Sequence, residues 1–445
     1  MALVLLFFVI AGIIFLTAVW KIHPLPVLLL GAFLFGVLKG FGSLETISMI
    51  SAGFGGTIRG IGLIIIPGTV IGVFMEHRGA LKIIAEKVIS FLGKKRAPFA
   101  MSLVGYIVST CIFCDSAFII LIGIWKKIGR LAKLPLAVGA TALSMGLFAS
   151  HCFIPPMPGP VAALTVLGAD FGKVLMFGAP AAFAAAVTGY FYAAFAGKND
   201  VLEVTIEESG EGKNEIPEFR HHWIIAFTPI VIPLFLIGAV SIAGVFKNQI
   251  SPGFYHILSI IGNPVSALFI GVVIAIFLIG KWSRMELTSE GVFGKAVVNA
   301  ANILMITGAG GAFGEVLKNV DFKYLIPENA GSFGAFAIVI PMGFSAILKI
   351  AQGSSTLAIL TSASAVVPLL ELLGLTSPAL RALTCCAVCC GAMIVSHTND
   401  SYFWVVTKFS GMSVRQGLKL QTVGSLISGI AAAIVLLLFA WCVTG

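Results

Sequence analysis

The sequence predicts an all-α polytopic membrane protein, and three observations support this fold class. First, 58% of the 445 residues are apolar, 11% are charged and the mean hydropathy is +1.06, whereas soluble proteins average about 25% charged residues. Second, apolar segments long enough to enter a bilayer recur along the chain. Third, the polar and proline-containing interruptions of these segments come in the same order in both halves of the chain.

The apolar segments are predicted to be helical spans or parts of spans. A full span needs about 20 residues, so residues 136–169 form one span that is interrupted in its middle. The interruption is ASHCFIPPMPGP, residues 149–160, whose prolines cannot continue a helix. The segments lie near residues 2–20, 24–42, 57–76, 136–150, 160–169, 174–196, 224–246, 257–280, 298–317, 378–396 and 420–443.

One strongly polar stretch, residues 197–222, separates two halves. It is acidic and contains glycines, which predicts a cytoplasmic linker. Each half is expected to hold scaffold spans followed by a transport part. The predicted divisions are 1–196 for the first repeat (scaffold 1–96, transport part 97–196) and 223–445 for the second (scaffold 223–330, transport part 331–445).

Two further apolar segments are predicted to be re-entrant hairpins. Residues 97–125 lie between two strongly basic flanks and carry CDS in the middle, so both ends are expected in the cytoplasm. Residues 331–373 carry KIAQGSST in the middle and have few basic flanking residues, which favours entry from the outside. Non-helical backbone at membrane depth requires cover by protein or water.

These assignments place most of the 28 basic residues inside and both termini outside. The halves then have opposite orientation, and each carries a hairpin followed by a broken helix that begins with Ser-His. Inverted repeats with broken helices that meet near the bilayer midplane are the architecture of secondary transporters. We therefore expect two opposed hairpins and two broken helices around one site, with an elevator movement of the transport part against the scaffold.

Candidate site residues of the first half come from the hairpin middle and the broken helix. Asp115, with Ser116, is expected to take part in ion coupling, because a carboxylate at this depth can bind Na⁺ or carry a proton. The alternative is that both residues cap the second arm of the hairpin. His151 can contact substrate or relay a proton, or it can satisfy carbonyls of the broken helix. Pro156 belongs to the break that opens the backbone towards the site.

Candidate residues of the second half lie at the corresponding places. Gln352, Gly353, Ser354, Ser355 and Thr356 form a hairpin tip whose backbone N–H groups and hydroxyls suit an anion. Lys349 is either the charge partner of a substrate carboxylate or a lysine whose ammonium extends to the interface. In SHTNDSYFW, His397 and Asn399 are candidate substrate ligands. Asp400 is either an ion-coupling group or a helix cap.

Other classes of function lack support in the sequence. GAGGAFG at residues 308–314 fails the dinucleotide fingerprint because Phe313 stands at the third glycine position, and nothing resembles a P-loop. The eight cysteines lie in apolar segments and are expected to pack rather than to bind metal. We therefore expect no enzyme activity, no cofactor other than the coupling ion, no resident metal and no nucleic-acid partner. The partners would be the bilayer and a small organic anion.

These motifs resemble the gluconate permease family of proton-coupled symporters, within a broader ion-transporter superfamily. The resemblance rests on HPLP at residues 23–26, CDSAF, SHCFIPPMPGPVAA, AQGSSTLAI and SHTNDSYFW. It implies proton-coupled or Na⁺-coupled symport of a sugar acid such as gluconate across the bacterial cytoplasmic membrane by an elevator-type homodimer. Uptake of D-serine or another small amino or hydroxy acid is the alternative, and a passive channel is a further one. Met157 stands where the family often has histidine, and Tyr402 where a small residue is usual.

Overall fold

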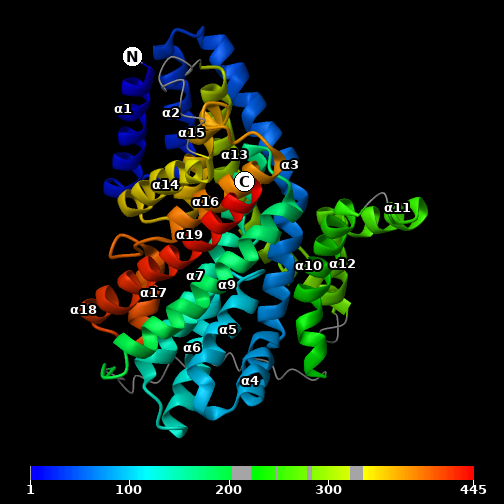
Figure 1. The fold of residues 1–445 in the computed structure, drawn as a ribbon, viewed down its shortest axis with the longest axis vertical. Helices are drawn as coiled ribbons and strands as arrows, with labels where there is room; N and C mark the ends of the chain where they lie inside the picture. Colours follow the sequence, from blue (N-terminus) through cyan, green and yellow to red (C-terminus); the bar gives the residue numbers. More distant parts are fainter. Residues whose placement is uncertain (1, 203–221, 247–248, 278–282, 321–333, 445) are drawn as a thin grey trace.

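The computed structural model describes residues 2–202, 222–246, 249–277, 283–320 and 334–444, and Figure 1 shows their arrangement. The described residues are helical and contain no strand. Most of the predicted linker, residues 203–221, lies outside the described residues, as do residues 321–333 next to the second predicted hairpin.

The helices of the first half cover all of the apolar segments predicted there and add one further helix. They are α1 (Ala2–Ile14, continued by a π-helical turn at Phe15–Val19), α2 (Pro24–Lys39), α3 (Ser43–His77), α4 (Ala80–Leu92), α5 (Ala97–Val108), α6 (Cys114–Leu131), α7 (Leu136–Phe153), α8 (Pro158–Leu167) and α9 (Phe171–Ala196).

The second half has a similar sequence of long and interrupted helices. They are α10 (Trp223–Val245), α11 (Pro252–Ile261), α12 (Pro264–Phe277), α13 (Val292–Lys318), α14 (Val339–Gln352), α15 (Ser355–Val366), α16 (Pro378–Met393), α17 (Ser401–Ser410), α18 (Val414–Gly417) and α19 (Val423–Thr444), with a π-helical turn at Leu418–Thr422 before α19.

Two turns and two breaks interrupt the apolar regions where the sequence predicts interruptions. The first turn (residues 109–113) joins α5 to α6, and the second turn (residues 353–354) joins α14 to α15. The first break (residues 154–157) separates α7 from α8 and contains a cis Pro155–Pro156 bond. The second break (residues 394–400) separates α16 from α17. Each of these four segments ends where a new helix begins.

Several element boundaries differ from the expected spans. α3 begins at Ser43 rather than near residue 57, and α4 is a helix where only a basic flank was expected. The expected span 257–280 is bent by 59° between α11 and α12, where the sequence Gly262-Asn263-Pro264 interrupts it. By length and composition, seven described helices can cross a membrane, or eight if this bent pair is one span.

The packing of α3 against α13 joins the two halves at the centre of the molecule. A Cβ atom on Gly53 would lie 2.5 Å from the Gly311 carbonyl oxygen, so these glycines allow close contact of the two helices. At Gly55, Gly56 and Gly62 of the same helix, an added Cβ would meet open space, so these glycines are not needed for that contact. Some helix contacts correspond between the two halves. The contact of α2 with α13 corresponds to that of α12 with α3, and the contact of α5 with α7 corresponds to that of α14 with α16.

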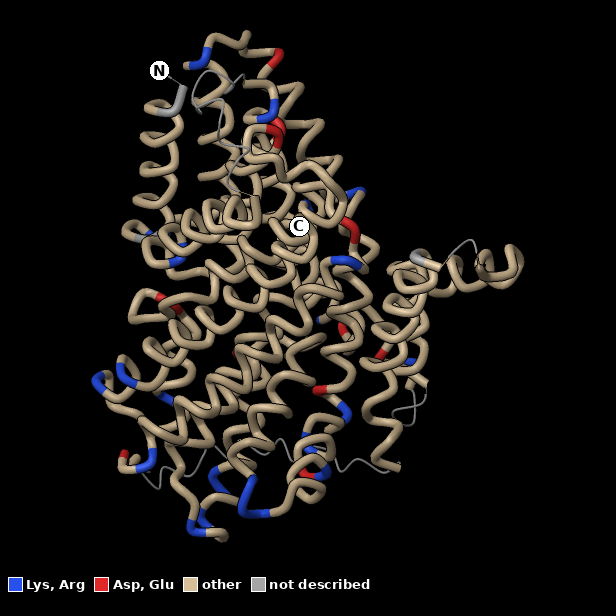
Figure 2. The backbone as a smooth tube through the Cα atoms, viewed as in Figure 1, with Lys and Arg blue, Asp and Glu red and all other residues tan. Residues whose placement is uncertain are grey.

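Basic side chains concentrate at one end of the molecule. Figure 2 shows that Lys and Arg predominate at the lower end, around the ends of α4 and α6, with fewer Asp and Glu residues among them. The basic lower end includes the short helix Lys94–Arg96 between α4 and α5, together with Lys126, Lys127 and Arg130 of α6. The distribution agrees with the basic flanks from which a cytoplasmic side is predicted.

Candidate functional site

A pocket of about 310 Å³ is lined by residues of the two turns and the second break and by the start of α8, which follows the first break. Its lining comes from seven helices and the segments beside them, and it joins both halves of the chain. The lining residues are Pro24, Phe113, Cys114, Asp115, Phe148, His151, Pro158, Asn302, Ile303, Ile306, Ser354, Ser355, Thr356, Leu357, Asp400, Ser401 and Tyr402.

Four helices begin at this pocket. These are the helices that follow the two turns and the two breaks: the first residues of α6, α8, α15 and α17 all contribute to its lining, as does Pro24 at the start of α2. The N-caps of α6 and α8, Phe113 and Met157, supply no side-chain hydrogen bond to the first turn. Ser354 and Asp400 cap α15 and α17 through their side chains. The positive ends of four helix dipoles therefore face one cavity, which favours negative charge there.

Asp115 and His151 are the carboxylate and the imidazole that the first half contributes to the pocket, beside the thiol of Cys114. Asp115 lies in the first turn of α6, but Phe113 is the N-cap, so the alternative of Asp115 or Ser116 as that cap is wrong. The buried Oδ1 atom of Asp115 and the buried Nδ1 atom of His151 have no hydrogen-bond partner among the described residues. Both atoms are thus available to a ligand, an ion or water.

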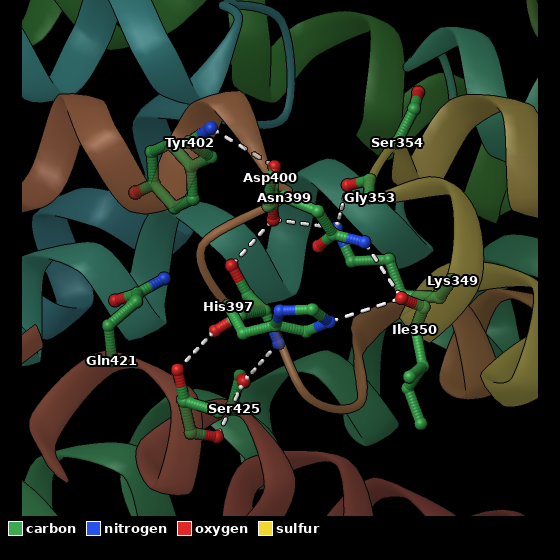
Figure 3. A network of polar contacts seen from close by, with 12 residues as sticks. Lys349, Ile350, Gly353, Ser354, His397, Asn399, Asp400, Tyr402, Gln421 and Ser425 are labelled. Atoms are coloured by element: carbon green, nitrogen blue, oxygen red, sulfur yellow. Dashed lines mark hydrogen bonds and ion pairs between the residues drawn. The ribbon is translucent and has the colours of Figure 1, made fainter. Parts of the chain in front are cut away.

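The second half contributes a carboxylate that already has a counter-charge. Lys349 Nζ lies 2.6 Å from Asp400 Oδ2, and the Lys349 side chain is completely buried. Figure 3 shows this ion pair between the end of α14 and the second break. Asp400 lines the pocket, whereas Lys349 does not. Asp400 Oδ1 also accepts a hydrogen bond from the Tyr402 amide over 3.0 Å, which confirms the predicted cap.

His397 and Asn399 face the end of α14 and do not line the pocket. The Ile350 carbonyl accepts hydrogen bonds from His397 Nε2 at 3.1 Å and from Asn399 Nδ2 at 2.7 Å (Figure 3). These side chains satisfy carbonyl groups that the end of a helix leaves without partners. The second turn and the second break are thereby joined by side-chain contacts.

The remaining predicted residues divide between the pocket and its supports. Ser354, Ser355 and Thr356 line the pocket. Gln352 and Gly353 do not, and the backbone of Gly353 has a φ angle of +79° that ends α14. A Cβ at this glycine would collide with the Asn399 carbonyl. Ser116 and Pro156 also lie outside the lining, and Pro156 packs against Gly68 of α3.

Three aromatic residues and one amide line the pocket without having been predicted as ligands. The Tyr402 ring stacks on Phe148 with centroids 5.3 Å apart, and its hydroxyl lies 3.2 Å from the Ser144 hydroxyl. Phe113 lies near His151, with centroids 6.3 Å apart. Asn302 comes from α13. NAANILMI holds two polar side chains, Asn299 and Asn302, and the sequence alone does not tell which of them faces the pocket.

The residues around the pocket carry no unpaired cation. No Lys or Arg lines the pocket within the described ranges, and the nearest ammonium, that of Lys349, is held by Asp400. Across those ranges no group of three or more His, Cys, Asp or Glu residues could hold a metal ion. The negative charge of Asp115 and the four helix N-termini are therefore the main electrostatic features.

Comparison with protein families matches residues 1–442 to the family described as GntP family permease. The inner membrane permease YgbN of Escherichia coli is 32% identical over 95% of this chain and 94% of its own length. The gluconate permease of Pseudomonas aeruginosa is 29% identical over 96% of this chain and 95% of its own. The D-serine transporter DsdX of Escherichia coli is 29% identical over 93% of this chain and 92% of its own.

Two solved transporter structures have a similar fold. The YdaH transporter of Alcanivorax borkumensis superposes with a TM-score of 0.67 at 13% identity, over 94% of this chain and 98% of that protein. MtrF of Neisseria gonorrhoeae superposes with a TM-score of 0.64 at 12% identity, over 94% of this chain and 95% of that protein. At this identity the likeness concerns the fold alone.

The match extends over almost the whole sequence, and the fold supplies seven or eight helices able to span a bilayer. The protein is accordingly a multi-pass protein of the cell membrane and a permease rather than an enzyme. The chain belongs to the GntP family of permeases.

Proposed function

We propose that this permease is a secondary active transporter that carries a small organic anion, gluconate or a related sugar acid, into the cell together with a proton or Na⁺. The observation that carries this proposal is the convergence of four helix N-termini on one pocket. Such termini attract anions, and discontinuous helices around a central site are a device of secondary transporters. The similarity to a gluconate permease over 96% of the chain supports the same substrate class.

Roles for individual residues follow from the pocket lining. The Ser354, Ser355 and Thr356 hydroxyls and the first turns of α6 and α15 would hold the carboxylate and hydroxyls of the anion. Asp115 would take the coupling ion, because its carboxylate lies in the pocket without a counter-charge. His151 would exchange hydrogen bonds with the cargo, because its free Nδ1 atom belongs to the same lining.

The proposed movement is that of an elevator. The two turns would be the tips of opposed re-entrant hairpins, and residues 1–196 and 223–445 would be inverted repeats. The matching contacts of α2 with α13 and of α12 with α3 support these repeats. The scaffold, including α3 and α13, would stay in place within a homodimer. The transport parts would slide against the faces where Gly60 meets Thr165 of α8 and Gly314 meets Ser364 of α15.

Uptake into proteoliposomes, with pH and Na⁺ gradients imposed separately, tests the proposal. The wild-type protein should accumulate labelled gluconate or a related sugar acid above equilibrium under one of these gradients. Asp115→Asn keeps the size of the side chain but removes its charge, so it should lose accumulation while retaining exchange of cargo. Unchanged accumulation in Asp115→Asn would show that Asp115 does not couple ion and cargo.

A D-serine or other small amino-acid or hydroxy-acid symporter is the second candidate function. The uncompensated Asp115 carboxylate could receive an ammonium group, and DsdX is as similar in identity as the gluconate permease. Competition separates the candidates, since D-serine should inhibit gluconate uptake only if both occupy the pocket. Equilibration without accumulation under either gradient would instead indicate a passive channel.

A further inference from the structure

The Lys349–Asp400 ion pair connects two parts of the site that lie 51 residues apart in the sequence. Lys349 belongs to the last turn of α14, just before the second turn, and Asp400 is the N-cap of α17 after the second break. The side chains are 0% and 5% exposed, so solvent does not screen this pair. Breaking such a pair leaves a buried charge without compensation.

The hydrogen-bonding capacity of both charged groups is used within the protein. Lys349 Nζ donates to the Gly353 carbonyl as well as to Asp400, and it lies 5.4 Å from the centroid of the Phe148 ring. Asp400 Oδ2 also accepts from the Ser396 hydroxyl, and Oδ1 accepts from the Tyr402 amide. Figure 3 shows these bonds in a continuous network. A cargo carboxylate would have to displace Asp400 to reach the ammonium.

The corresponding place in the first half is built differently. Asp115 lies near the first turn, but no counter-charge is paired with it among the described residues. The second half of the site is thus neutral by itself, whereas the first half carries an uncompensated carboxylate. The charged group that is free to interact with an ion or with cargo is therefore Asp115 of the first half.

We propose that the Lys349–Asp400 pair is a positioning strap, which holds the second turn against the second break. Lys349 and Asp400 stay bonded to each other and to their neighbours in the protein throughout transport. Lys349 does not contact the cargo, and Asp400 acts through Lys349 and through its cap on α17. The strap keeps Ser354, Ser355 and Thr356 directed at the pocket. This role differs from the direct substrate contact predicted for Lys349 and the ion coupling predicted for Asp400, and it rests on the proposed transport function.

A charge-removal cycle tests the strap. Lys349→Met and Asp400→Asn are each expected to lower the melting temperature and to reduce uptake of gluconate by about tenfold or more, because each leaves one buried charge alone. Asparagine remains a good N-cap, so Asp400→Asn keeps the cap on α17. The double variant Lys349→Gln with Asp400→Asn removes both charges but supplies two amides that can bond to each other, so it should recover thermal stability together with most of the lost uptake and the wild-type pH profile.

Other outcomes would overturn the strap. In the double variant Lys349→Gln with Asp400→Asn, recovery of stability without recovery of KM would mean that Lys349 binds the cargo directly. Recovery of uptake without accumulation would mean that Asp400 carries the coupling ion. A melting temperature of either single variant equal to that of the wild type would show that the pair holds nothing in place.

Two controls keep the test decisive. Lys349→Met with Asp400→Asn also removes both charges but leaves no hydrogen bond between the two positions, so it should regain stability while its KM stays raised; a wild-type KM in this control, or failure of both double variants to regain stability, contradicts the strap. Thermal stability is measured without cargo, so this arm remains valid if sugar acids are not transported. Failure of wild-type uptake of every sugar acid would instead defeat the proposed function.

Discussion

At the scale of single residues, the site combines groups that the sequence marks with groups that only the fold brings together. Asp115, His151 and the Ser354–Thr356 hydroxyls stand out as polar residues in apolar segments, and the structure places them in one pocket. Tyr402 is different, because its place in the site depends on α7. Its ring stacks on Phe148, and its hydroxyl contacts Ser144.

Tyr402 is predicted to act as a wall of the pocket. Tyr402→Phe removes the hydroxyl but keeps the ring, and it should cost about 1 kcal/mol of unfolding free energy with little change in KM. Tyr402→Ala removes the ring and should cost about 3–5 kcal/mol, while admitting larger sugar acids. Thermal unfolding and a KM series over cargo sizes measure both effects. A KM raised equally by both variants would mean that the hydroxyl itself binds the cargo.

The limits of sequence reasoning are clearest at Lys349. Its burial and its partner Asp400 depend on contacts across 51 residues, so local sequence equally permits a substrate ligand or an interfacial lysine. By contrast, the cap on α17 is a local feature, and the sequence offers it as one of two roles for Asp400, beside ion coupling. Asn302 enters the pocket through the packing of α13, which periodicity in an apolar helix does not resolve.

At the scale of elements, the interruptions of helices were predictable and the positions of several helix ends were not. Proline and glycine signal the first break and the second turn directly, because they remove donors or permit a positive φ angle. The early start of α3 was missed because residues 43–56 are mixed in polarity, and their contacts with α13 stabilise them as a helix.

Gly60 of α3 tests the proposed sliding face. A Cβ at this position would lie 2.8 Å from Thr165 Cγ2 of α8, whereas Gly62 faces open space. Gly60→Ala should therefore slow uptake at saturating cargo, and the matched variant Gly62→Ala should transport at the wild-type rate. Initial uptake rates, normalised to the protein in the membrane, provide the comparison. Equal rates for both variants would argue against movement at this contact.

At the scale of the whole molecule, the two halves are held together by the contact of α3 with α13 and by an ion pair beside it. Arg78 Nη2 bonds to Glu286 Oε2 across 208 residues, and the two side chains are 9% and 18% exposed. The pair joins the end of α3 to the short helix Arg284–Leu287 that precedes α13. It thus fixes the ends of the two central helices relative to each other.

Removal of this ion pair should weaken the whole molecule more than removal of an exposed pair. Arg78→Ala should lower the unfolding free energy by about 1–3 kcal/mol, since Glu286 then loses its guanidinium partner in a partly buried place and keeps only His77, 3.5 Å away, and the Ser283 amide. Lys318→Ala breaks the exposed pair with Glu315 and should cost less than about 0.5 kcal/mol. Denaturation in detergent compares the two, and equal losses would contradict a special role for Arg78.

The central claim is that the pocket at the four helix N-termini is where the cargo binds. Leu357→Cys introduces a thiol into the lining while leaving Ser354, Ser355 and Thr356 unchanged. Native Cys442, the exposed cysteine among the eight, does not belong to the lining and serves as an internal control. The most direct measurement is the alkylation rate of both thiols with and without gluconate. The account predicts that saturating gluconate slows alkylation at position 357 and leaves Cys442 unaffected; unchanged alkylation at position 357 in protein that still accumulates gluconate would contradict it.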